Sequence, residues 1–122
     1  MDAEELKART KRFGLRVIKL VESLPASRTS NVIGDQLLRS GTSVGSIHRA
    51  ACRGRSKPDL ISKVGIAIEE TDESLYWMEI LIESSIVPQE RLINLMNEAN
   101  ELIAILTASV KTARSNSSKS KG

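Results

Sequence analysis

The chain has 122 residues, which fits one domain, and carries a formal net charge of +3 with only one Phe, one Trp and one Tyr. Its core must therefore be aliphatic, and the many Glu, Lys and Arg residues beside Leu, Ile, Val and Ala favour helices. A single Cys52 excludes an intrachain disulfide, no secretion signal is recognisable, and no apolar run approaches the roughly 18 residues that cross a bilayer, so we expect a cytoplasmic protein without membrane contact.

The first predicted helix spans about residues 4–24. Its apolar residues recur at spacings of three, four and seven, which places them on one helical face. Pro25 disfavours a helical conformation at the residue before it and ends the run. The opposite side of this helix carries a basic series: Lys7, Lys11, Arg12, Arg16 and Lys19.

The second predicted helix spans about residues 30–53, with Thr29 or Ser30 as its N-cap. It contains Gly34, Gly41 and Gly45, each of which lowers helix propensity by roughly 1 kcal/mol relative to Ala. Three such residues need an offsetting gain, and we expect them to let another helix approach closely. Gly54 then fits the left-handed position that follows a helix end.

The third and fourth predicted helices span about residues 58–84 and 89–114. Ser56 and Pro58 mark the start of the third helix, and its apolar residues step by three and four in a heptad-like seam. The fourth helix repeats this pattern, whereas residues 115–122 are polar and basic and are expected to be disordered. Short connections between long helices predict an all-α, up-down-up-down antiparallel four-helix bundle over residues 1–114.

Charge is divided unevenly along the sequence. Residues 1–63 carry a net charge of +7, residues 64–110 carry −8, and residues 111–122 carry +4. This asymmetry predicts a basic surface opposite an acidic one, or charges that pair between subunits of an assembly.

Three patterns resemble catalytic or ligand-binding sites without meeting their requirements. His48 and Cys52 are four residues apart on one helix, but zinc needs three or four protein ligands and the chain has no other His or Cys. The acidic run that includes Glu69, Glu70 and Glu73 lacks the Glu-x-x-His pairs of di-metal bundles. The segment 41–45 lacks the ending of a phosphate-binding loop, and its hydroxyls have no base at a recognisable spacing. We therefore predict a protein that is not an enzyme and needs no cofactor or metal.

The basic residues are the strongest functional candidates, because Lys and Arg clusters bind phosphates. The candidates for nucleic-acid contact are Lys11, Arg12, Arg16, Lys19, Arg39, Arg49, Arg53, Arg55 and Lys57. The alternative is that these arginines pair with acidic residues of the third helix in a neighbouring subunit. The two interpretations stay open at this point. Tyr76 and Trp77 are interpreted as packing or interface residues and not as base-stacking platforms, and we group them with Gly34, Gly41 and Gly45 as candidates for helix packing or an oligomer interface.

Three stretches, QLLRSGTSVG, RAACRGRSKPDLISK and ESLYWMEILIES, resemble the four-helix-bundle family of the rRNA intervening-sequence proteins. The resemblance covers about residues 10–112 and rests on segment 39–45, on Ser56 with Lys57, and on Tyr76 with Trp77. It implies a bundle that assembles as a five-membered ring. It also implies kinship with the accessory variability determinant proteins of diversity-generating retroelements, which bind nucleic acid and a reverse transcriptase. The expected partners are thus further copies of the chain, RNA or DNA, and a reverse transcriptase.

Overall fold

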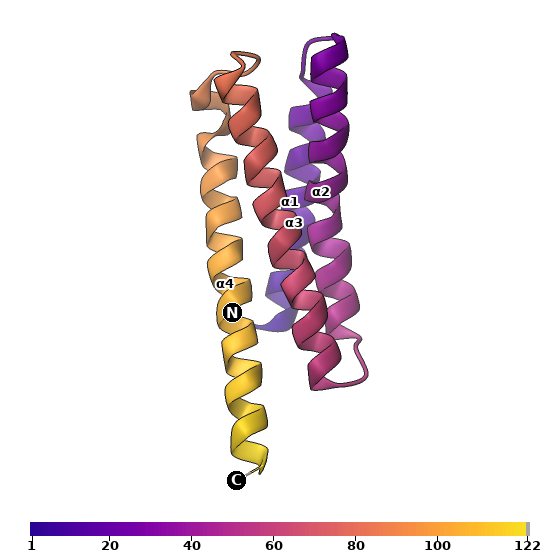
Figure 1. Cartoon of the computed structure of the whole chain (residues 1–122), viewed down its shortest axis with the longest axis vertical. Coiled ribbons are helices and arrows are strands. Elements are labelled where there is room, and N and C mark those ends of the chain that lie inside the picture. Colours follow the sequence, from indigo (N-terminus) through magenta and orange to yellow (C-terminus); the bar gives the residue numbers. More distant parts are fainter. Residues whose placement is uncertain (122) are drawn as a thin grey trace.

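The computed structural model describes the backbone of residues 1–121 and the side chains of residues 1–116, and this part of the chain contains helices and no strand. In chain order the helices are α1 (Ala3–Glu22), α2 (Arg28–Cys52), α3 (Lys57–Glu83) and α4 (Gln89–Lys121). They run alternately up and down, joined by short turns (Figure 1). The all-α class and the four helices are confirmed, while assembly into a ring stays a prediction.

Side-chain caps determine where the helices begin. Asp2 accepts a hydrogen bond from the Glu5 amide at 2.8 Å, and Ser27 accepts one from the Ser30 amide at 3.1 Å. The cap of α2 is therefore Ser27, and the prediction of Thr29 or Ser30 was wrong because the helix begins earlier. At α3, Ser56 accepts from the Asp59 amide at 3.2 Å, where the sequence predicted the start.

The turn between α3 and α4 contains the one non-glycine residue with a positive φ among the described residues, Ser85 at 63°. The Ile86 amide donates to the Leu81 carbonyl and the Ser85 amide donates to the Ile82 carbonyl, each at 3.0 Å. This pair of bonds forms a Schellman ending, a motif in which glycine usually occupies the left-handed position.

Helix α4 continues to Lys121, past the predicted end at residue 114. The predicted disorder of residues 115–122 falls mainly on residues 117–122, whose side chains lie outside the described residues. In Figure 1 the last turns of α4 extend below the other three helices. No helix within residues 1–121 combines the length and the apolarity that spanning a membrane requires.

The core runs along the bundle axis and draws on every helix. Phe13 of α1, Leu37 of α2, Met78 of α3 and Leu102 of α4 are all fully buried. Extensive packing joins α1 to α2, α2 to α3 and α3 to α4, but α1 and α4 approach each other at few positions. The bundle is thus closed along three seams and more open along the fourth.

Candidate functional site

The antiparallel topology gathers positive charge at one end of the bundle. The start of α1, the turn between α2 and α3, and the later part of α4 all lie at the lower end in Figure 1. We call this region the basic end and define it by nine cationic residues from the four helices and the turn between α2 and α3: Lys7, Lys11, Arg49, Arg53, Arg55, Lys57, Lys63, Lys111 and Arg114.

Few of these charges are neutralised within the chain. Lys7 pairs with Glu4 at 2.8 Å and Lys63 pairs with Asp59 at 3.1 Å. Arg49, Arg53 and Arg55 are exposed and form no ion pair with any described residue. Their guanidinium groups are therefore available to an anion from outside the chain.

A shallow hollow at the turn between α2 and α3 brings several basic side chains together. Its lining includes Arg49, Arg53, Arg55 and Lys63. Gly54 lies in the same wall, where an added Cβ would be 2.5 Å from Asp59 Oδ2 and 2.9 Å from the Ala51 carbonyl oxygen. None of the glycines among the described residues has a positive φ, so the predicted left-handed conformation of Gly54 was wrong. Glycine is needed there because an added Cβ would collide with the Asp59 side chain at the start of α3 and with the Ala51 carbonyl near the end of α2.

The predicted basic residues do not form one continuous surface. Lys11 lines a groove between α1 and α2 together with Arg49 and Arg53. Arg16 lies on another side of α1, where its charge adds to the hydrogen bonds from Arg9 in lowering the pKa of Glu98 of α4. Since Arg12 is one helical turn from Arg16, it shares that side of α1.

Arg39 is paired with acidic residues of its own chain. It forms ion pairs with two carboxylates of α3, with Glu70 at 3.3 Å and with Glu73 through a shorter contact. One of the nine candidate nucleic-acid contacts, Arg39, is thus neutralised by the acidic helix α3. The alternative interpretation expected such pairs between neighbouring subunits, whereas this pair forms within one chain.

The three glycines of α2 face α1 of the same chain. A Cβ at Gly45 would lie 3.2 Å from the Lys11 amide nitrogen, and one at Gly41 would lie 2.7 Å from a methyl group of Val17. At Gly34 the nearest atom would be Leu24 Cδ1, also at 3.2 Å. The close approach predicted from sequence therefore joins α1 and α2, and any role of these glycines between subunits stays a prediction.

Two exposed apolar surfaces lie on opposite helices. On α1, Leu15 and Ile18 are 56% and 37% exposed and line the α1–α2 groove. On α3, Ile66 and Tyr76 are 42% and 51% exposed. The Tyr76 ring meets the Trp77 ring edge to face with centroids 5.0 Å apart.

Polar contacts bridge the open seam between α1 and α4. Arg9 donates two hydrogen bonds to the carboxylate of Glu98 and one to Glu101, each at 2.7 Å. The bonds from Arg9 lower the pKa of Glu98, and the bond to Glu98 raises the pKa of Arg9. We call this three-residue group the Arg9 clasp.

His48 and Cys52 lie near the basic end, with Nε2 and Sγ 3.6 Å apart. Burial, together with the nearby charge of Lys7, lowers the pKa of His48. Among the described residues, no three His, Cys, Asp or Glu side chains come together in a way that could hold a metal ion.

Four residues of the basic end were not among the candidates for nucleic-acid contact: Lys63, Lys111, Arg114, and Lys7, which the sequence placed only in the basic series of the first helix. The up-down-up-down topology could have identified them, because in such a bundle the end of the last helix lies at the same end as the start of the first. A residue-by-residue assessment of charge does not use that relation.

Comparisons with known proteins agree with the fold. A model of the 23S rRNA-intervening sequence protein family matches residues 4–108. A solved structure from Bacteroides thetaiotaomicron, a protein of unknown function in the S23 ribosomal protein family, is similar with a TM-score of 0.85 and 32% identity. That alignment covers 91% of this chain and 99% of the other. No curated protein matches the chain.

Proposed function

The chain belongs to the 23S rRNA-intervening sequence protein family, and we propose that it is a non-enzymatic homo-oligomer, a pentameric ring, that binds RNA or DNA through its basic end in the cytoplasm. One observation carries the proposal: nine cationic side chains from the four helices and the turn between α2 and α3 gather at one end of the bundle, and Arg49, Arg53 and Arg55 form no ion pair with any described residue.

Contacts of this kind favour binding to the phosphate backbone. Phosphate oxygens accept hydrogen bonds from Lys and Arg whatever the base sequence, and each neutralised phosphate releases counterions. Tyr76 and Trp77 lie on α3 away from the groups that line the hollow at the turn. The proposed binding is therefore largely independent of sequence and decreases steeply as salt rises.

Binding of a fluorescent RNA hairpin across a salt series tests this proposal. We expect Arg49→Ser with Arg53→Ser to weaken binding and to reduce the slope of log K against log salt by about one for each phosphate that is no longer neutralised. The matched control removes two cations at the opposite end, Arg28→Ser with Arg91→Ser, and should leave binding nearly unchanged. Equal effects of the two pairs, or no binding at low salt, would contradict the proposal.

The oligomer is the second part of the proposal. The α1–α2 groove presents exposed Leu15 and Ile18 beside basic residues, whereas the outer face of α3 presents exposed Ile66 and Tyr76 among acidic residues. Two different, complementary surfaces on one chain favour head-to-tail contacts, which close into a ring when the rotation per subunit fits.

Sedimentation of the purified protein tests the assembly. Ile18→Glu should shift the species from about five chain masses toward one, because it buries a charge in the proposed contact. Val32→Glu changes an equally apolar exposed residue, 56% accessible, that lies outside the groove, and it should leave the oligomer intact. A wild-type protein that sediments as a monomer would exclude the ring.

A purely structural assembly is the alternative function, and the Arg39 pairs with Glu70 and Glu73 favour it, since they show acidic α3 neutralising an arginine of α2. Under that alternative, Arg49→Ser with Arg53→Ser would dissociate the oligomer and the protein would bind no RNA.

We propose a reverse transcriptase as a further partner, by analogy with the retroelement accessory proteins that the sequence resembles. Co-purification with a reverse transcriptase encoded beside this gene is the expected result. If no reverse transcriptase gene lies beside this gene, the proposed partner loses its support. The proposal of nucleic-acid binding does not depend on this result.

A further inference from the structure

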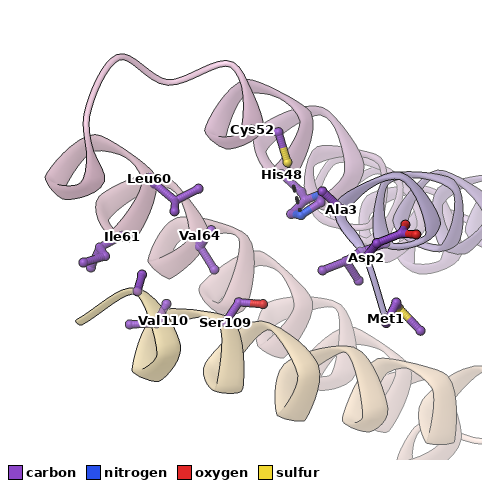
Figure 2. Close-up of a pocket in the computed structure, with 12 residues that line it drawn as sticks. Met1, Asp2, Ala3, His48, Cys52, Leu60, Ile61, Val64, Ser109 and Val110 are labelled. Carbon is purple, nitrogen blue, oxygen red and sulfur yellow. Dashed lines mark hydrogen bonds between the residues drawn. The ribbon is translucent and has the colours of Figure 1, made fainter. Parts of the chain in front are cut away.

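Two hollows at the basic end of the bundle differ in the groups that line them. Figure 2 shows the hollow beside His48, of about 190 Å³, whose wall is mostly aliphatic and has Asp2 as the one charged side chain among the described residues. The other is an open hollow of about 870 Å³ at the turn between α2 and α3, which we call the turn hollow. An anion is expected in the turn hollow, because the hollow beside His48 offers it no cation.

Cationic side chains dominate the wall of the turn hollow. Arg49, Arg53, Arg55 and Lys63 line it, and Asp59 is the one acidic residue among the described residues of the wall. Asp59 already accepts a hydrogen bond from Lys63 at 3.1 Å. The charges of the three arginines are therefore not neutralised by any other group of the wall.

Helix capping does not account for these arginines. Arg49 lies in the last turn of α2 and Arg53 is its C-cap, four residues later, so their like charges repel each other. Cations near a helix C-terminus often bond its free carbonyl groups. Here no side chain of the three arginines donates to a carbonyl or carboxylate oxygen of any described residue. A bound anion would offset the repulsion and accept their hydrogen bonds.

The donors suit a ligand with several linked phosphates. A guanidinium group is a planar fork of N–H donors that matches two oxygens of one phosphate, so three forks in one hollow have more donors than a single phosphate ion can use. The volume is also larger than such an ion fills. Successive phosphates of an RNA backbone are separated by a ribose, whereas those of an oligophosphate share bridging oxygens and concentrate their charge.

We propose that the turn hollow binds an oligophosphate group, the chemistry shared by the 5′-triphosphate end of an RNA and a free nucleoside triphosphate. Arg49, Arg53 and Arg55 donate to oxygens of different phosphates. For an RNA end, the inference rests on the proposed function and adds a preference for the terminus over internal phosphates. Because the hollow is open, the rest of the RNA can continue along the α1–α2 groove, which Arg49 and Arg53 also line.

Calorimetric titration of the full chain with inorganic tripolyphosphate at low salt tests the site without RNA. Tripolyphosphate should bind at least about tenfold more tightly than orthophosphate, because it accepts hydrogen bonds from several guanidinium groups at once. Citrate, a carboxylate anion with several charges, should also bind more weakly than tripolyphosphate. Absence of tripolyphosphate binding would overturn the proposal. Equal binding of the three anions would overturn it too, since it would show attraction to charge alone.

Substitutions at exposed residues locate the binding. Arg55→Ser should weaken tripolyphosphate binding by at least about fivefold. Lys57→Ser removes the same charge from a residue that lines a different hollow, and it should weaken binding less. Arg53→Lys keeps the charge but loses the planar fork, so it should weaken binding as well. Arg28→Ser, at the opposite end of the bundle, should leave binding unchanged. Equal losses in Arg55→Ser and Lys57→Ser would refute the assignment to the turn hollow.

Two RNA hairpins of one sequence distinguish the sources of the oligophosphate. A hairpin with a 5′-triphosphate should bind more tightly than one with a 5′-hydroxyl, and Arg55→Ser should remove the difference. If the two hairpins bind equally while ATP displaces tripolyphosphate, the ligand is a free nucleotide.

The same measurements separate this inference from the proposed function. If the hairpins bind equally and tripolyphosphate does not bind, the inference fails and the proposed function stands. If neither hairpin binds while tripolyphosphate does, the proposed function fails and the oligophosphate site stands.

Discussion

Helix α1 is bound to its two neighbours in different ways. Toward α2, the two backbones approach closely: a Cβ added at Gly45 would lie only 3.2 Å from the Lys11 amide nitrogen. Toward α4, the helices approach at few positions, and the Arg9 clasp is the main polar connection among the described residues. One seam depends on the absence of side-chain atoms and the other on long charged side chains.

The difference shows how each seam responds to change. A seam of close backbones has no room to adjust, so added volume must separate the helices. A seam bridged by flexible charged side chains adapts to added volume but depends on protonation and salt. The two seams should therefore respond differently to added volume, to removed charge and to pH.

The largest effect is expected from added volume at the close seam. Gly45→Leu should lower the free energy of unfolding by about 3 kcal/mol, since the nearest atoms belong to the α1 backbone and cannot rotate away. Gly65→Leu is the matched control, because an added Cβ there meets nothing within 4 Å. The control should be neutral or stabilising by up to about 1 kcal/mol. Urea denaturation measures both variants, and equal losses would refute the contrast.

A smaller effect is expected at the open seam. Glu98→Gln should lower stability by about 1–2 kcal/mol, because it removes a carboxylate that is 15% exposed and accepts two bonds from Arg9. Glu101→Gln changes a carboxylate that is 65% exposed and should lower stability by less than about 0.5 kcal/mol. A larger loss in Glu101→Gln than in Glu98→Gln would contradict the assigned role of the clasp.

The two seams should also lose stability in different ranges of pH. Burial lowers the pKa of His48, so the unfolded chain binds the proton more readily and stability falls as pH drops through and below about 6.5, by at most about 1.4 kcal/mol per unit. The bonds from Arg9 lower the pKa of Glu98, so its contribution is complete above the unfolded value of about 4.5 and declines below it. Thermal unfolding measured from pH 8 to pH 3 tests both effects. His48→Leu should remove the loss of stability near pH 6.5, and Glu98→Gln should remove part of the loss below about 4.5.

The smallest effect is expected at the far end of the open seam. Arg91 donates a 2.6 Å bond to Ser23 Oγ, an exposed contact between α4 and the end of α1. Arg91→Ala should change stability by less than about 0.5 kcal/mol. A loss as large as that of Glu98→Gln would show that the polar connection is spread along the seam and not concentrated at Arg9.

The sequence predicted the helices well because each carried a strong local signal. Apolar spacing placed the core residues, and Ser56 followed by Pro58 marked the start of α3. The start of α2 was misplaced because Ser27, Thr29 and Ser30 all qualify as caps, and sequence alone does not rank them. Ser85 gave no signal, since its left-handed conformation usually requires glycine or asparagine.

The candidate site was less predictable because it depends on tertiary placement. Arg39 and Arg49 look equivalent in sequence, but Arg39 meets Glu70 and Glu73 whereas Arg49 remains unpaired among the described residues. The unpaired Nδ1 of His48 is likewise a property of packing, because it depends on which groups the other three helices bring near the ring.

A partly open hollow near the basic end, to which α1 and α4 both contribute, has a consequence for the order of the chain. Met1 and Ala113 line the same space, so the beginning of the first helix and the late part of the last lie near each other. A short linker from residue 114 to residue 1 would therefore join them, and new termini could open at the exposed turn around Ser85. Such a circular permutant should keep the four-helix fold while moving both chain ends away from the basic residues. It would allow fusion tags to be attached without covering them.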